Sequence, residues 1–172
     1  MRERVCCFTG HRKLPAHRIN QIIKRLNDEV DALIRQGVTE FISGGALGFD
    51  QIAASLIIAK RQMGENVRLI FALPHRGYDE KWTTAQRNLY CGLLGGANEV
   101  RYISEAYAAD CMKKRNFYMV ENSKWCLCAL LHKRSGTSQT VRYAREKGLK
   151  IINIADSLAV NVCYNNGYQW GV

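Results

Sequence analysis

The chain has 172 residues, of which 47% are apolar and 23% charged, and its formal net charge is +10. This length suits one domain with a sizeable core, and the composition is that of an ordinary globular protein, which excludes a disordered or fibrous chain. No apolar run approaches the roughly 20 residues of a membrane span, and the N-terminus shows no long apolar region typical of a signal peptide, so we expect a cytoplasmic protein. The positive charge favours anionic partners such as nucleotides or nucleic acid.

The first predicted elements are a short buried strand and an amphipathic helix. Residues 5–8 form an apolar run that ends at the polar loop Thr9-Gly10-His11-Arg12, which carries two candidate anion contacts. Residues 17–36 place apolar side chains at helical spacing and stop at Gly37, a residue suited to the end of a helix. We therefore predict a helix with one buried face after the first polar loop.

A glycine-rich stretch follows, Ser43-Gly44-Gly45-Ala46-Leu47-Gly48-Phe49-Asp50. It lies between the apolar run 39–42 and a largely apolar segment, 51–63, of helical length, so its glycines sit where a strand turns into a helix. Glycine has no Cβ to keep a ligand from the backbone, and a helix N-terminus offers N–H groups to an anion. Two interpretations remain open at this point, a phosphate site and a tight connecting turn that binds nothing.

The middle of the chain continues the alternation. Residues 67–73 predict a third strand, stopped by Pro74 and the polar residues up to Tyr78. A helix over 80–94 and a fourth strand over 99–103 come next. The helix predicted over 110–122 carries Arg115 and Asn116, which either reach the strand ends or pair with a neighbouring carboxylate.

The last predicted strands enclose a second polar loop. Residues 125–131 are the most continuous apolar run, typical of a central strand covered on both faces. The loop after them contains Ser135, Gly136 and Thr137, and a helix up to residue 147 and a strand over 150–154 follow. We assign residues 1–155 to one domain and residues 156–172, which show weak periodicity, to a C-terminal extension.

Seven cysteines are present, an odd number, and none of them forms a C-x-x-C pair. Several lie in the apolar runs predicted to be strands. Cys126 and Cys128, two residues apart on one strand, would point the same way with no further metal ligand in sight. We predict reduced thiols in the core and no metal site.

Strand and helix alternate throughout, with connections too long for hairpins. This pattern predicts a Rossmann-like α/β fold, a doubly wound, mainly parallel sheet with helices on both faces. Such sheets bind ligands at the carboxyl ends of their strands, near the point where the strand order reverses. Four polar loops would share this edge, residues 9–12, 43–50, 74–78 and 134–137. Their predicted co-location favours a phosphate site over a connecting turn.

Five motifs carry a family resemblance. They are Phe8 to Arg12, Ile42 to Asp50, Ala72-Leu73-Pro74 with Trp82, Arg115 to Val120, and Ser135-Gly136-Thr137 with Tyr143-Ala144. In order and spacing the chain, up to about residue 154, resembles the SLOG superfamily of Rossmann-like proteins, and most of all its YpsA-like branch. The superfamily also includes the Lonely Guy phosphoribohydrolases and DNA-processing protein A, a single-strand DNA binder. The resemblance implies a ligand with a nucleotide-like part and suggests a homodimer.

Two departures from these relatives matter for function. The Lonely Guy enzymes follow their second glycine loop with a catalytic glutamate, whereas the matching position here is Thr140, whose hydroxyl cannot replace a carboxylate. DNA-processing protein A resembles this chain at both glycine loops and at Arg115-Asn116, and Tyr78, Trp82 or Tyr118 would stack bases if exposed. No additional nucleic-acid-binding module is recognisable in the sequence.

We therefore predict binding of a nucleotide or nucleotide-derived ligand, in a sensor or signalling role and with no separate cofactor. Single-stranded nucleic-acid binding and a nucleotide-processing hydrolase are the alternatives. Backbone N–H groups and hydroxyls would hold phosphates, arginines would balance their charge, and Asp50 would orient the loop or contact a ribose hydroxyl. The predicted site residues are Thr9, Gly10, His11, Arg12, Ser43, Gly44, Gly45, Gly48, Asp50, Pro74, Arg115, Asn116, Ser135, Gly136 and Thr137.

Overall fold

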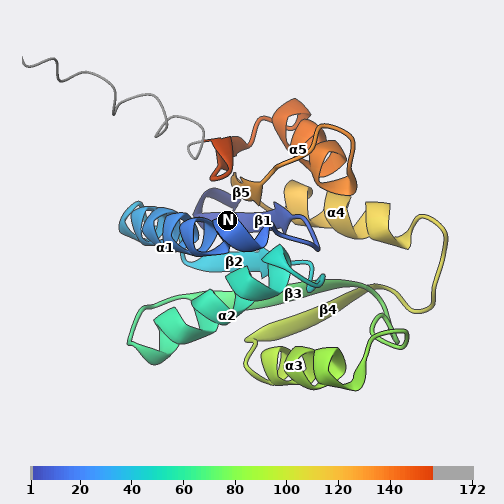
Figure 1. Cartoon of the computed structure of the whole chain (residues 1–172). Coiled ribbons are helices and arrows are strands. Elements are labelled where there is room, and N and C mark those ends of the chain that lie inside the picture. Colours follow the sequence, from blue (N-terminus) through green and yellow to red (C-terminus); the bar gives the residue numbers. More distant parts are fainter. Residues whose placement is uncertain (1, 157–172) are drawn as a thin grey trace, which may run out of the picture.

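A computed structural model describes residues 2–156 (Figure 1). Strands and helices alternate through this range. The strands are β1 (Val5–Gly10), β2 (Glu40–Ser43), β3 (Arg68–His75), β4 (Glu99–Ser104), β5 (Trp125–Ala129) and β6 (Lys150–Asn153). The α-helices are α1 (Ile19–Arg35), α2 (Phe49–Gln62), α3 (Thr84–Gly95), α4 (Cys111–Glu121) and α5 (Gly136–Glu146), and two short 3-10 helices, Arg2–Arg4 and Ala16–Arg18, precede β1 and α1.

The six strands form one sheet in the order β4-β3-β2-β1-β5-β6, and every neighbouring pair is parallel. The chain moves outward from β1 to β4 and then returns to place β5 on the other side of β1. The strand order therefore reverses between β1 and β5, where the register pairs Thr9 with Cys128 and Gly10 with Ala129. The doubly wound parallel sheet predicted from the sequence is confirmed, and this reversal marks its expected ligand crevice.

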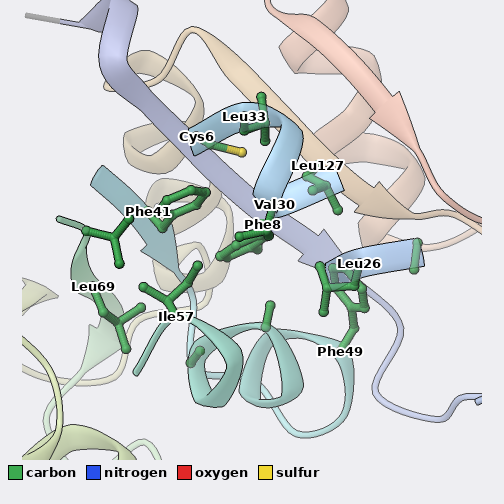
Figure 2. Packing of buried hydrophobic residues seen from close by; sticks show 14 of the residues in the cluster. Cys6, Phe8, Leu26, Val30, Leu33, Phe41, Phe49, Ile57, Leu69 and Leu127 are labelled. Atoms are coloured by element: carbon green, nitrogen blue, oxygen red, sulfur yellow. The ribbon is translucent and has the colours of Figure 1, made fainter. Parts of the chain in front are cut away.

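One face of the sheet is covered by α1, α2 and α3 (Figure 1). The buried side of α1 presents Ile22, Leu26, Val30 and Leu33, spaced three or four residues apart as a single helical stripe requires. Figure 2 shows Phe8 among the labelled residues of this layer, between Phe41 and Phe49. Its ring is stacked on Phe41 at a centroid distance of 5.6 Å and is edge-on to Phe49 at 6.5 Å. This packing fixes the start of α2 against the end of β1.

The opposite face is covered by α4 and α5, and it holds a group of thiols. Cys7, Cys126 and Cys128 are buried there beside Met119 and Val141. Hydrogen bonds with the thiols of Cys128 and Cys7 that favour its protonated form, together with burial, raise the pKa of Cys126 well above its ordinary value. Within residues 2–156, Cys91 is the one exposed cysteine, and no group of three or more potential ligands is arranged to hold a metal ion.

Most predicted boundaries differ from the structure by a few residues; for example, β1 continues through Thr9 and Gly10, which were predicted to be loop. Two of the differences have a clear local cause. The third helix begins at Thr84 rather than at residue 80, because Thr83 caps it: its hydroxyl accepts the N–H of Gln86, and the Gln86 side chain accepts the N–H of Thr83. Pro74 does not stop β3, which continues to His75. Extended backbone accommodates proline where no ladder hydrogen bond is needed, and the register with β4 pairs Leu73 and His75 but not Pro74.

The predicted extension, residues 156–172, lies outside the described residues except for Asp156. Within the described part of the chain, no helix has the length and apolar character needed to cross a bilayer. Asn153, at the end of β6, accepts the N–H of Leu130 and so ties the last strand to the chain leaving β5.

Candidate functional site: a pocket at the strand-order reversal

Ten of the predicted site residues line one pocket of about 300 Å³ at the carboxyl ends of β1 and β5. They are Thr9, Gly10, His11, Arg12, Asp50, Arg115, Asn116, Ser135, Gly136 and Thr137. A larger hollow of about 580 Å³ lies at the opposite edge of the sheet, near Val5 and Thr39, and contains none of the predicted residues. We place the candidate site in the smaller pocket because it occupies the crevice where parallel sheets of this kind bind ligands.

The glycine-rich stretch reaches this pocket through Ala46 and Asp50, whereas its glycines do not line it. Ser43 is fully buried, and its hydroxyl donates to the carbonyl oxygen of Asp50 at 2.9 Å and accepts the N–H of Gly45 at 3.2 Å. A side chain at Gly45 would meet Leu73 and Tyr90, which belong to the apolar core. The backbone of this stretch is thus bonded internally, and its role in the fold is to deliver Asp50 to the pocket.

The N-terminus of α2, which the sequence offered as an anion site, is occupied by the chain itself. The N–H of Phe49 donates to the carbonyl oxygen of His11 at 3.2 Å. Gly48 precedes it with φ +84°, and a Cβ there would lie 2.3 Å from the carbonyl oxygen of Arg12. Glycine is required at position 48 by both its backbone conformation and this close approach.

Asp50 contributes a buried carboxylate to the pocket wall. It is 5% exposed, and its pKa is raised to about 6, chiefly because burial disfavours the charged form. The positive charge of Arg115 and the N–H groups of Ala46 and Gly10 act in the opposite direction and limit the rise. Among the described residues that line the pocket, Asp50 is the one carboxylate.

Arg115 lies across the pocket on α4 and is 4% exposed. One terminal nitrogen of its guanidinium donates to the carbonyl oxygen of Gly44, and a Cβ at Gly44 would collide with that nitrogen. The Nε atom is buried and has no hydrogen-bond partner among the described residues. A buried guanidinium donor without an acceptor is unfavourable, and a bound anion would supply the missing acceptor.

The N-terminus of α5 forms another part of the pocket wall. Ser135 caps this helix, since its hydroxyl accepts the N–H of Ser138 at 3.1 Å. The N–H groups of Gly136 and Thr137 precede the first bond of the helix, which Gln139 donates to Ser135. A Cβ at Gly136 would meet no atom within 4 Å. The hydroxyl of Thr140 donates to the carbonyl oxygen of Gly136 at 3.0 Å, so its proton is already used within the helix.

His11 and Arg12 connect the first loop to two others. The Nε2 atom of His11 accepts the N–H of Leu131 at 3.0 Å, which requires a neutral imidazole with its proton on Nδ1. Burial and the neighbouring His132 lower the pKa of His11 and favour this neutral form. Arg12 donates to the hydroxyl of Tyr78 at 3.4 Å, beside the end of β3.

The structure therefore divides the predicted set into two groups. The ten residues above come together, whereas Ser43, Gly44, Gly45, Gly48 and Pro74 lie behind or beside the pocket wall. Ala46, Met112 and Met119 also line the pocket and were not anticipated. The methionines gave no usable signal, because apolar residues on a helix indicate core packing equally well. The binding roles of all these residues stay predictions.

A protein-family model, that of the YspA SLOG family, matches residues 6–155. The chain belongs to the YspA SLOG family. Among curated proteins, an uncharacterized SPbeta prophage-derived protein of Bacillus subtilis, YoqJ, is 27% identical to this chain over 144 residues, covering 74% of this chain and 84% of that protein. The UPF0398 protein BH1768 of Halalkalibacterium halodurans is 30% identical over 107 residues, covering 61% of this chain and 57% of that protein.

Solved structures similar to this family member include two DNA processing proteins A. The Streptococcus pneumoniae protein superposes with a TM-score of 0.64 at 17% identity, covering 92% of this chain and 56% of its own. The Helicobacter pylori protein, described as binding single-stranded DNA, superposes with a TM-score of 0.60 at 16% identity, covering 92% of this chain and 72% of its own. At these identities the likeness shows the shared fold. The chain spans little more than half of the pneumococcal protein.

Proposed function

We propose that the pocket between β1 and β5 binds the phosphate of a nucleotide or nucleotide-derived ligand. The observation that carries this proposal is Arg115, a buried guanidinium in the pocket lining whose Nε has no acceptor of its own. In the same pocket lining, the first N–H groups of α5 supply further donors and the positive end of a helix dipole. A phosphate bound between Arg115 and the start of α5 would accept hydrogen bonds from both sets of donors.

The arrangement supports binding in a sensor or signalling role better than hydrolysis. The position of the catalytic glutamate in the Lonely Guy pattern is Thr140, which is buried and bonded within its own helix. Asp50 accepts backbone N–H groups and faces the positive charge of Arg115, so its carboxylate already has partners. Incubation with nucleoside monophosphates and chromatography of the products tests this: release of a free base or of phosphate would make the protein a hydrolase.

Gly136→Asp tests the phosphate site without disturbing the fold. The new side chain would enter open space at the start of α5, where a carboxylate is favourable to the helix itself by about 0.3–1 kcal/mol. The same charge would repel a bound phosphate, since like charges brought together cost several kcal/mol. We expect native thermal stability and at least a roughly tenfold loss of affinity for nucleoside 5′-monophosphates, measured by isothermal titration calorimetry.

Thr84→Asp is the matched control, because it adds the same charge at the first position of α3, outside the pocket. It should leave nucleotide affinity unchanged. Equal affinity in native protein, Gly136→Asp and Thr84→Asp would place the ligand elsewhere and refute the proposed site.

Single-stranded nucleic acid is the second candidate, favoured by the net charge of +10 and by the fold shared with the single-stranded DNA-binding protein of H. pylori. Its signature differs from that of a mononucleotide. Each phosphate contact releases a counterion, so the affinity for an oligonucleotide should fall steeply with salt concentration, in proportion to the number of phosphates contacted. Titrations of a mononucleotide and a short oligonucleotide at two salt concentrations separate the two candidates.

A further inference from the structure

A cluster of aromatic side chains lies at the carboxyl ends of β3 and β4, outside the pocket. The ring of His75 is edge-on to Tyr78 at a centroid distance of 6.0 Å and to Tyr107 at 5.5 Å. Behind them, Tyr78 packs against Trp82 at 5.2 Å and Tyr90 at 6.4 Å. Tyr78 and Trp82 are partly buried against the main core, so the cluster is anchored from behind.

The front of this cluster faces solvent. Tyr107 is 74% exposed. It is one of the few large apolar side chains in residues 2–156 that are exposed to solvent. Packing does not explain it, because its one described ring contact is with His75. Tyrosine rings presented in this way, on a rigid support, are the surface on which unpaired bases stack.

Positive charge borders the same rings. The guanidinium of Arg76 lies 4.5 Å from the centroid of the Tyr102 ring and pairs with the exposed Glu105 at 3.1 Å. Arg12 donates to the Tyr78 hydroxyl and also lines the pocket. Arg12 thus joins the aromatic cluster to the proposed phosphate site.

The strand order determines how long a ligand must be to reach both the aromatic cluster and the start of α5. The start of α5 follows β5, whereas His75 and Tyr78 lie at the end of β3 and Tyr107 follows β4. The sheet places β1 and β2 between β5 and β3. Three strand spacings amount to about 14 Å. A stacked strand rises about 3.4 Å per nucleotide along its axis, so the two places are a few nucleotides apart.

We propose that His75, Tyr78 and Tyr107 form a base-stacking platform for single-stranded nucleic acid whose phosphate occupies the pocket at the start of α5. This inference rests on the proposed phosphate site and extends it from a mononucleotide to a strand. Bases stack on Tyr107 and His75, Arg12 lies between the platform and the pocket, and the backbone runs along the carboxyl edge of the sheet.

Tyr107→Ala tests the platform, since an exposed side chain can be removed without loss of stability. Stacking of one base on an aromatic residue contributes enough that its loss weakens binding roughly tenfold. We expect this loss for oligothymidylate and oligouridylate of twelve nucleotides in fluorescence anisotropy, with thymidine 5′-monophosphate affinity unchanged in calorimetry. Tyr107→Phe should bind like the native protein, because the ring is kept.

Two controls make the result specific. Leu89→Ala removes another exposed apolar side chain, on α3, and should leave all affinities unchanged. An oligonucleotide with 2-aminopurine at successive positions should lose fluorescence on binding native protein and keep more of it with Tyr107→Ala, because stacking quenches the base. Abasic oligonucleotide should bind native protein and Tyr107→Ala equally.

The outcomes distinguish the platform from the phosphate site. If Gly136→Asp abolishes mononucleotide binding while Tyr107→Ala leaves oligonucleotide affinity intact, the phosphate site stands and the platform is refuted. If native protein binds the oligonucleotide no more tightly than the mononucleotide, the platform is likewise refuted. If neither ligand responds to Gly136→Asp, the phosphate site itself fails, and with it the inference that depends on it.

Discussion

Arg115→Met is expected to weaken nucleotide binding more than any other single change proposed for this protein. The guanidinium is 4% exposed, and its Nε has no acceptor within the described residues. Removing one partner of a buried, hydrogen-bonded charge pair costs about 2–5 kcal/mol, equivalent to roughly a thirtyfold to several-thousandfold loss of affinity. Calorimetry with nucleoside 5′-monophosphates measures the loss directly.

Arg115→Lys and Lys114→Met complete the experiment. Lysine keeps the charge but lacks the Nε donor and the planar fork, so it should recover only part of the affinity. Lys114 precedes Arg115 on α4, is exposed and pairs with Asp110, so its replacement by methionine should leave binding unchanged. Equal effects of the two methionine variants would mean that the overall positive charge, rather than the pocket, attracts the ligand.

Thermal unfolding of Arg115→Met separates binding from folding. Methionine fills similar space on α4, but the carbonyl of Gly44 loses its donor and Asp50 loses the nearby positive charge that lowers its pKa. Asp50 then remains protonated to higher pH, which limits the damage. A variant that unfolds cooperatively yet fails to bind assigns Arg115 to the ligand, whereas a protein that binds tightly without this side chain contradicts the proposed site.

Asp50→Asn is expected to make the protein more stable at neutral pH. The pKa of Asp50 is raised to about 6 in the folded chain from 3.8, so the folded state holds a proton that the unfolded state releases between these values. This stability is fully present below about pH 4 and is lost as the pH rises through 6. A difference of about two pKa units corresponds to ~3 kcal/mol, of which asparagine should recover about 1–3 kcal/mol at pH 7.5.

Denaturant unfolding of native protein and Asp50→Asn at several values between pH 4 and pH 7.5 measures this effect. The stability difference between the two proteins should grow with pH and level off above 6. Asp110→Asn is the matched control, because Asp110 is exposed in a surface pair with Lys114 and should show no such trend. A difference that stays constant across this range would mean that Asp50 titrates normally.

If Asp50→Asn is more stable than the native protein, the native carboxylate destabilises the fold, which would indicate a role in binding. A buried carboxylate that destabilises the fold at neutral pH is retained in proteins chiefly where it acts, and such strongly shifted groups gather at functional sites. If Asp50→Asn is both more stable and weaker in binding a ribonucleotide than the native protein, the carboxylate contacts the ligand, as the sequence predicted for a ribose hydroxyl. Comparing ribonucleotide and deoxyribonucleotide affinities in both proteins isolates that contact.

Local patterns were sufficient to predict the fold and most of its elements. The spacing of Ile22, Leu26, Val30 and Leu33 specifies the buried stripe of α1, and the apolar run of β5 marks a central strand. Boundaries failed where side-chain capping or proline geometry decides them. The capping box of Thr83 and Gln86 delays α3, and the register around Pro74 lets β3 continue.

The prominent glycines illustrate why a motif alone did not identify the binding surface. Gly45 faces Leu73 and Tyr90, and Gly48 lies against the carbonyl oxygen of Arg12, so both are required by packing within the chain. Gly136 looks the same in the sequence, yet a side chain there would enter open space. Glycine spacing cannot distinguish a close approach of protein to protein from a close approach of protein to ligand.

The sequence by itself determined that this chain is a parallel, doubly wound sheet with polar loops along one edge, because helical and strand periodicities are local properties. Only the tertiary structure decided which loops meet. The order β4-β3-β2-β1-β5-β6 joins the loops after β1 and β5 in one pocket and places β3 three strand spacings, about 14 Å, from β5. Strand order and the burial of Arg115 depend on contacts between residues far apart in the chain, which no local pattern encodes.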